Sequence, residues 1–467
     1  MVMKKLSVLA MAMIVMASCA KENVQPNNEP SGEKQLLEIG LASTKTQLGK
    51  EDNGFFPIVW SEGDEIAVIE NMGVEGKQNV SVYSLREGAG TANGVFELVE
   101  GSPKVTNNVD VVYPASAVKG KGLIKDISLL VPKDQTQSYE DGNFDKNAAV
   151  MYFHRNNPAD KIVLEPLSSI ICIPIKGFDD NDVVTAVKWQ NMDGRTATVT
   201  LNCPNGVTLS KGQATNFYLS IQPMLKDCNG IAYVYLKNGA IQVKTPRNLK
   251  AFKAGTLHRF PEWTLSKKAK WTILGYGSQR DATTWEQVPL GPAQYMIDGN
   301  DLSWWESRRK PNSDNTKAIM AGQHTFVIDL GSKQEIKGIK IKSKESKGSP
   351  KYGIKLNNGS DVLGTQSYNP PHTFHIGFTA NDPGKDAIKA FTANKTWPEG
   401  MTNTTFKSEN SKSINFYYGN DKKTWWNNEL DTPVTARYVF IHFQYAWNND
   451  GTGTAAPFEK VAELDIY

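Results

Sequence analysis

The feature of this sequence that most limits its fold is a long series of short apolar or alternating runs, separated by Gly, Asn, Asp and Pro. From Leu36 onward no segment sustains an apolar period of about 3.6 residues, so the pattern predicts β-strands. Asn238-Gly239 lies between two such runs and predicts a tight hairpin, because both residues tolerate positive φ. We expect an all-β chain of sandwiches, since packed sheets hide apolar faces and strand edges. The clearest runs cover residues 66–69, 109–113, 127–131, 196–201, 217–221, 231–236 and 240–243.

The 467 residues are too many for one compact domain, because domains usually span about 100–200 residues. Eight of the eleven Trp residues follow position 263, and a polar, Lys-rich stretch covers residues 265–270. This change predicts a domain boundary near residue 264. The polar segment 156–160 predicts a weaker one. The expected globular units are residues 36–158, 159–263 and 264–467.

The composition excludes several classes of protein. Lys and Arg number 52 against 49 Asp and Glu, a net charge of +3, and no long run of like charge indicates a nucleic-acid partner. No two of the six His residues have the i, i+4 spacing of a zinc protease. Neither a Gly-Lys-Ser/Thr phosphate loop nor a Gly-x-Ser-x-Gly elbow occurs. We therefore expect a binding or structural protein and not an enzyme.

The N-terminus has the three parts of an export signal. Lys4-Lys5 precedes an apolar run over residues 6–17, which is shorter than the roughly 20 residues that span a bilayer. Met16-Ala17-Ser18-Cys19 resembles a bacterial lipobox, which implies a signal peptide over residues 1–19 and lipidation of Cys19. The polar residues 20–35 predict a flexible stalk. We expect a lipid-anchored, surface-exposed protein of the outer membrane; the alternative is a plain secretory signal with a chance Cys.

Five segments between residues 44 and 263 follow one another in a characteristic order: Thr44-Lys45-Thr46, 59–66 (VWSEGDEI), 112–116 (VYPAS), 131–135 (VPKDQ) and 170–177. In this order they resemble the fimbrillin-like lipoproteins of bacterial surfaces. The resemblance implies two consecutive β-sandwiches and, where subunits polymerise, donation of a strand to a neighbouring subunit. Trp60 and residues 66–69 are expected to pack one sandwich face, and Gly63-Asp64 to form a turn. The alternative is a rigid two-sandwich spacer.

Residues 271–467 carry a second set of ordered segments: 296–305 (MIDGNDLSWW), 326–331 (FVIDLG) with 336–341, 414–425, and 436–441 with 462–467. They resemble a discoidin-like domain, also called a coagulation-factor type C module, which is similar to a family of carbohydrate-binding modules. The resemblance implies a β-sandwich of jelly-roll type. Residues 343–412 are longer and more irregular than the family usually places between these strands.

The 298–303 loop offers oxygen ligands of the kind that a hard cation needs. By resemblance it is a structural calcium site, held by Asp298, Asp301, Ser303 and, from the last strand, Glu463. Such an ion would pin the loop to the sheet. The alternative is a hydrogen-bonded Asx turn in which Glu463 faces solvent.

Two pairs of adjacent tryptophans indicate a ligand-binding face. By resemblance Trp305 and Trp425 serve the core, so Trp304 and Trp426 should point the other way along an extended chain. An exposed indole is a platform for the apolar face of a sugar. The alternative is that these rings pack against the inserted loops.

Further candidate ligand contacts lie beside these tryptophans. Arg308, Arg309 or Asn427 could bond sugar hydroxyls, and Trp447 is a third candidate platform. We therefore predict that the discoidin-like domain binds glycans or glycoproteins, in adhesion or glycan capture. The second interpretation is an accessory or tip subunit of a fimbria-like assembly, with fimbrial subunits as partners. An enzyme of glycan breakdown is the third.

The cysteines leave one pairing open. Cys203 and Cys228 both lie beside turn residues, so a disulfide between them is an option in an oxidising compartment. Cys172 lies inside an apolar stretch and is expected to be a buried thiol.

Overall fold

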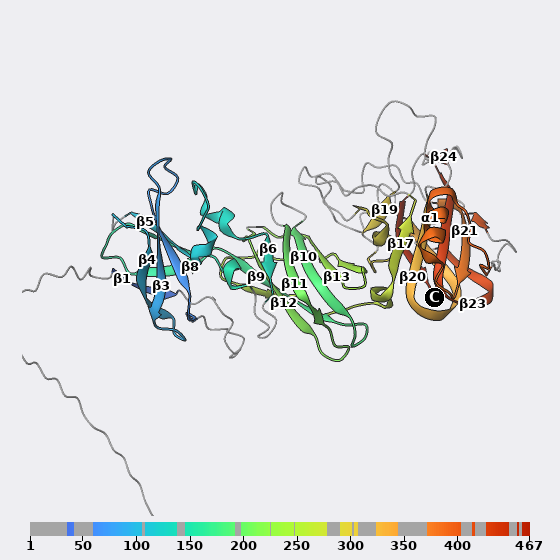
Figure 1. Ribbon diagram of the computed structural model, residues 1–467, viewed down its shortest axis with the longest axis horizontal. Coiled ribbons are helices and arrows are strands. Elements are labelled where there is room, and N and C mark those ends of the chain that lie inside the picture. Colours follow the sequence, from blue (N-terminus) through green and yellow to red (C-terminus); the bar gives the residue numbers. More distant parts are fainter. Residues whose placement is uncertain are drawn as a thin grey trace, which may run out of the picture. The chain divides into compact units, whose positions relative to one another are not determined.

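Strands joined by turns and short 3-10 helices account for most of the described chain, which confirms the prediction of an all-β fold (Figure 1). The computed structural model describes residues 35–41, 59–104, 108–137, 145–191, 198–224, 226–246, 248–277, 290–300, 303–306, 324–343, 371–402, 413–415, 426–447, 455–456 and 460–467. Cys19, residues 20–34 of the predicted stalk and Thr44-Lys45-Thr46 lie outside these residues.

The first unit is a closed barrel, with the strand order β1-β4-β3-β2-β5-β7-β8. Neighbouring strands are antiparallel except β1 and β8, which pair in parallel. Closure pairs the strand edges that an open sheet would expose. Its strands are β1 (Leu36–Leu41), β2 (Glu65–Glu70), β3 (Asn79–Glu87), β4 (Asn93–Glu100), β5 (Val109–Tyr113), β7 (Met151–Arg155) and β8 (Ile162–Pro166).

Trp60 occupies the barrel interior. Its ring is fully buried and meets Phe96 and Tyr113 edge-on, with centroids 4.8 and 5.4 Å away. The predicted turn at Gly63-Asp64 is confirmed: the Asp64 carboxylate accepts hydrogen bonds from the Ser61 amide at 2.8 Å and the Tyr113 hydroxyl at 3.0 Å. The turn and the core are therefore tied together.

Strand β2 separates two apolar clusters, because alternate side chains face opposite sides of a sheet. Ile66 and Val68 join Trp60 in one cluster, whereas Ala67 and Ile69 join another. The expectation that residues 66–69 pack a single face is therefore wrong.

The first unit also extends further than predicted. Strands β7 and β8 pair through Met151 and Pro166, so the boundary expected between residues 158 and 159 falls inside the barrel. In addition, β6 (Asp134–Thr136) pairs with β11 of the next unit. A closed barrel therefore stands where the first sandwich was expected.

The second unit has two sheets, with strand orders β14-β13-β10-β11-β6 and β12-β9-β15, and β16 also pairs with β9. Side chains of both sheets share one apolar core, in which Trp189 is fully buried. Its remaining strands are β9 (Ser169–Lys176), β10 (Val183–Asn191), β11 (Thr198–Thr208), β12 (Thr215–Ile221), β13 (Gly230–Leu236), β14 (Ile241–Lys244), β15 (Leu257–Arg259) and β16 (Trp263–Thr264).

Local predictions in these two units succeed and fail for identifiable reasons. The hairpin at Asn238-Gly239 joins β13 and β14, with Gly239 at φ +92°, as predicted. Residues 127–131 do not form the predicted strand: Ile127–Leu130 is a 3-10 helix whose apolar side chains pack on the outside of the barrel. Cys172, Cys203 and Cys228 are buried thiols, and no disulfide joins Cys203 to Cys228.

The C-terminal module begins after the 3-10 helix η5 (Lys267–Lys270), which follows β16. Its described strands follow the order β18-β19-β25-β20-β23-β21-β22, with β17 on β20 and β24 on β23. These strands are β17 (Thr272–Tyr276), β18 (Leu290–Gly291), β19 (Trp304–Glu306), β20 (Thr325–Ser343), β21 (Pro371–Thr379), β22 (Ser413–Asn415), β23 (Trp426–Trp447), β24 (Ala455–Ala456) and β25 (Lys460–Ile466).

The long strands β20 and β23 each contribute to two layers. Their pairing register breaks between Asp329 and Gln334, and Gly331 at φ +82° lies in this bend (Figure 1). On one side of the bend β17 and β21 are the neighbours, and on the other side β25 is. Phe326 and Ile339, which come from opposite sides of the bend, belong to one buried cluster. The module is therefore a β-sandwich.

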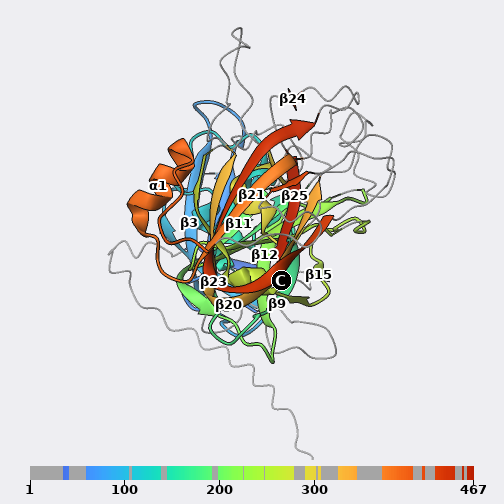
Figure 2. The ribbon, with the colours of Figure 1, turned by 90° about the vertical axis from the view of Figure 1, so that its right-hand side faces the viewer.

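One helix was not predicted. Helix α1 (Gly384–Asn394) lies within the irregular 343–412 segment and covers the outer face of the module (Figures 1 and 2). Its Phe391 is buried against Phe440, 5.0 Å between centroids. The helix was not predicted because only one of its side chains is fully buried, so its sequence has only a weak apolar period of about 3.6 residues. Among the described residues, no helix is long and apolar enough to span a membrane.

Candidate functional site

The topology of the C-terminal module brings distant strand ends to one end of the sandwich. Because β23 bends in its middle, its first residue, Trp426, and its last, Trp447, lie at the end opposite the bend. Ser343 and Val461 pair at this same end, where β25 begins, and Trp305 of β19 pairs with Val461. We call this end of the module the rim.

The structure reverses one prediction at the rim. Trp305 is fully buried and meets Phe326 edge-on at 4.7 Å, as expected for a core residue. Trp304 is only 3% exposed, so its indole does not offer the open face that was predicted. The side chains of Trp304 and Trp305 are both buried, although they are neighbours on the short strand β19. Alternation along a strand separates two faces, but it does not make either face solvent-exposed.

The other predicted ligand contacts can be placed only by their backbones. Trp426 and Asn427 pair with Ile341 and Lys340 at the start of β23, and Trp447 pairs with Ala455 of β24. Their side chains lie outside the described residues, as do Arg308, Arg309 and Trp425. The backbones of Trp304, Trp426 and Trp447, which are far apart in sequence, therefore all lie at the rim.

The predicted metal loop is held by its own hydrogen bonds. The Asp298 carboxylate is 1% exposed and accepts the Asn300 amide at 2.8 Å and the Ser303 hydroxyl at 2.6 Å. Burial raises the pKa of Asp298 well above its ordinary value, and the nearby Glu463 carboxylate adds to the rise. The hydrogen-bonded Asx turn, which was the alternative to the predicted calcium site, is therefore present, while Asp301 lies outside the described residues.

Glu463 is buried rather than facing solvent, at 3% exposure. Its Oε1 accepts a hydrogen bond from the ammonium of Lys268, a residue of η5 that is itself 6% exposed. The same ammonium donates to the Leu464 carbonyl at 2.6 Å. Burial raises the pKa of Glu463, and the Lys268 charge partly offsets that rise. Nothing in the sequence pointed to Lys268, because it lies 195 residues from Glu463 in a Lys-rich stretch that resembles a polar joint.

In the arrangement observed, Asp298, Ser303 and Glu463 already have hydrogen-bond partners within the protein. Calcium takes six to eight oxygen ligands, but the ammonium already occupies Glu463 Oε1 and the Leu464 carbonyl. Within the described chain no group of three or more His, Cys, Asp or Glu side chains is placed to hold a metal ion. The calcium site stays a prediction from resemblance.

Three histidines lie beneath the rim. The rings of His375 and His442 stack with centroids 5.7 Å apart, and His324 meets Trp305 edge-on at 6.0 Å. Burial lowers the pKa of His442 to about 3 and that of His324 to about 4. The His442 and His324 imidazoles are therefore neutral at physiological pH.

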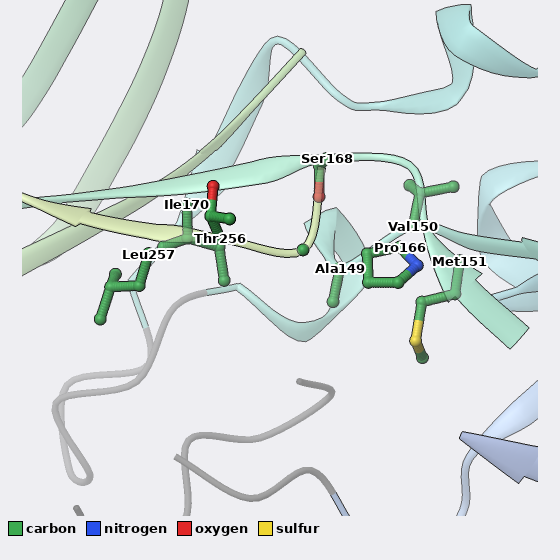
Figure 3. A pocket seen from close by; sticks show the side chains of 9 residues that line it. Ala149, Val150, Met151, Pro166, Ser168, Ile170, Thr256 and Leu257 are labelled. Atoms are coloured by element: carbon green, nitrogen blue, oxygen red, sulfur yellow. The ribbon is translucent and has the colours of Figure 1, made fainter. Parts of the chain in front are cut away.

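A small pocket elsewhere in the chain does not resemble an active site. It is lined by apolar side chains such as Met151, Ile170 and Leu257 and by two hydroxyls, from Ser168 and Thr256 (Figure 3). No charged side chain lines it, so it offers neither an acid nor a base.

No family model and no curated protein matches the sequence. Among solved structures, a family 32 carbohydrate-binding module from Clostridium perfringens NanJ, in complex with galactose, is 14% identical, with a TM-score of 0.21; the match covers 43% of this chain and 95% of that one. A chitosan-binding module from a Paenibacillus chitosanase/glucanase is 14% identical (TM-score 0.21), covering 42% and 92%. A SusE-like protein is 11% identical (TM-score 0.25), covering 64% and 95%. Likeness at this level carries no argument about ligand or activity.

Proposed function

We propose that this chain is a lipid-anchored cell-surface protein whose C-terminal sandwich binds glycans or glycoproteins, in adhesion or glycan capture, and is not an enzyme. The observation that supports this proposal is the rim. The fold gathers Trp426 and Trp447 at one end of the sandwich, although 20 residues separate them in the same strand. Aromatic rings grouped at one end suit a sugar, because its C–H face packs on an indole while its hydroxyls bond neighbouring polar groups.

Glycan-array binding by the full chain tests this proposal. Trp426→Ala and Trp447→Ala should each weaken affinity for any glycan that binds by about 1–3 kcal/mol, as expected for loss of an aromatic contact. Trp397→Ala is the matched control, because Trp397 is 37% exposed but packs beside α1, on Phe391. Absence of any glycan ligand, or unchanged affinity in both rim variants, would count against the proposal.

Membrane attachment is tested separately. Cys19→Ala should release the protein from the membrane fraction and abolish labelling with a radioactive fatty acid, because acyl chains on this thiol would supply the anchor. A Cys19→Ala protein that stays in the membrane fraction would exclude lipid anchoring through this residue.

One feature of the barrel favours the second candidate function, a subunit of a fimbria-like assembly. Strand β1 lies between β4 and β8 and closes the barrel, pairing in parallel with β8. It is the first described strand, and its Leu36 is 48% exposed. A terminal closing strand is the kind of element that strand donation would replace. Ladders of polymer on unheated denaturing gels are expected in that case, and a single monomer band in cell extracts would exclude it.

A further inference from the structure

Calcium was predicted beside Glu463, but the structure has a lysine side chain there, that of Lys268. It comes from η5, ahead of the first strand of the module, and the Ser266 hydroxyl caps this short helix by accepting the Lys268 amide at 3.3 Å. Its side chain passes Trp271, with the ammonium 5.6 Å from the ring centroid. Since Trp271 is 1% exposed and belongs to the core of the module, the lysine is held in a defined position.

The ammonium has the contacts expected of a bound cation. It donates to Glu463 Oε1 and to the Leu464 carbonyl, both on the last strand, β25. It also lies close enough to Asp298 to act on that carboxyl electrostatically. One fixed positive charge therefore contacts the Glu463 carboxylate and also acts electrostatically on Asp298, the other buried carboxyl predicted to hold calcium.

A calcium ion bound through Glu463 Oε1 would compete with this ammonium. It would displace Lys268 from that oxygen, although the lysine is only 6% exposed. The displaced ammonium would then be a buried, unpaired charge, which is strongly destabilising. The free-energy cost of this displacement would offset the binding of calcium.

We propose that the Lys268 ammonium is the resident cation of the Asp298 and Glu463 carboxyl pair. The C-terminal module therefore holds its 298–303 loop beside the last strand without calcium. The charge is supplied by a residue that lies outside the segments resembling the discoidin-like family. The loop is consequently secured by the same short helix that leads out of the second unit.

Differential scanning calorimetry of the full chain tests this in two ways. First, the melting profile of the wild-type protein should be the same in millimolar CaCl2 and in EDTA. Second, Lys268→Met, which keeps the aliphatic stem and removes the charge, should lower the melting temperature of the affected transition by roughly 6 °C or more, because it leaves a buried carboxylate without its partner.

Lys267→Met is the matched control in the same helix. Lys267 contacts the Ile466 carbonyl at 2.8 Å and Asp465 at 3.4 Å, but its side chain is 39% exposed and does not contact Glu463. It should shift the melting temperature far less than Lys268→Met. A calcium-dependent rise in wild-type stability that Asp298→Asn abolishes would overturn the proposal. So would a Lys268→Met protein as stable as the Lys267→Met control.

Discussion

Replacement of Gly230 by Ala should strongly destabilise the second unit. Gly230 is the first residue of β13 and is buried beneath Trp189. A methyl group built on its backbone would lie 1.9 Å from Cη2 and 2.3 Å from Cζ2 of that indole. Ordinary contacts between carbon atoms start at about 3.5 Å, so the ring would have to move by roughly 1.5 Å.

The indole has no free space into which it can move. Trp189 is fully buried, and its ring centroid lies 5.2 Å from Phe260 and 6.4 Å from Phe252. Overpacking of a filled core costs about 1–3 kcal/mol. We expect Gly230→Ala to fall near the upper end of this range, about 3 kcal/mol in the free energy of unfolding, because three rings must rearrange together.

Urea unfolding followed by tryptophan fluorescence measures this loss. The matched control is Gly122→Ala, because a methyl group at Gly122 would meet no atom within 4 Å. The control should change the free energy of unfolding by no more than about 0.5 kcal/mol. If both variants unfold at the same urea concentration, the packing described around Trp189 is wrong.

Three further measurements test the C-terminal module. Trp304→Ala should lower the free energy of unfolding by about 3–5 kcal/mol, because it empties a buried site; a fully stable variant would show that the ring is exposed. Lowering the pH from 7 to 5 should remove about 2 kcal/mol of stability through His442, since the unfolded chain binds protons below its His pKa of about 6.5, whereas buried His442, with a pKa lowered to about 3, stays neutral when folded. The raised pKa of Glu463 acts in the opposite direction, so the effect is measured as a difference: between pH 7 and pH 5 the free energy of unfolding of wild type should fall by about 2 kcal/mol relative to that of His442→Asn, and equal changes in both proteins would contradict this. Arg437→Met removes a two-pronged ion pair to Asp329, with N–O distances of 2.7 and 2.8 Å, and should cost only about 1 kcal/mol because the arginine is partly exposed; a loss of several kcal/mol would contradict this.

Features that depend on neighbouring residues could be predicted from the sequence. The hairpin at Asn238-Gly239 and the turn at Gly63-Asp64 formed as expected, since positive φ and short-range hydrogen bonds decide them locally. Apolar patterning also identified the all-β class. Apolar patterning gave a wrong prediction for residues 127–130. This apolar run was predicted as a strand but forms a 3-10 helix, because packing against the barrel decided its conformation.

Local patterns in the sequence were enough to predict that the chain is built from strands, where two of its tight turns lie, and that carboxylates cluster in one loop beside a pair of tryptophans. The burial of individual side chains and the pairing of distant charges could be read only from the folded chain. The sequence could not reveal that Trp304 is covered or that Lys268 reaches Glu463 across 195 residues of chain. The physical reason is that alternation and turn propensity act over a few residues, whereas burial and ion pairing depend on long-range strand register, which brings distant segments together.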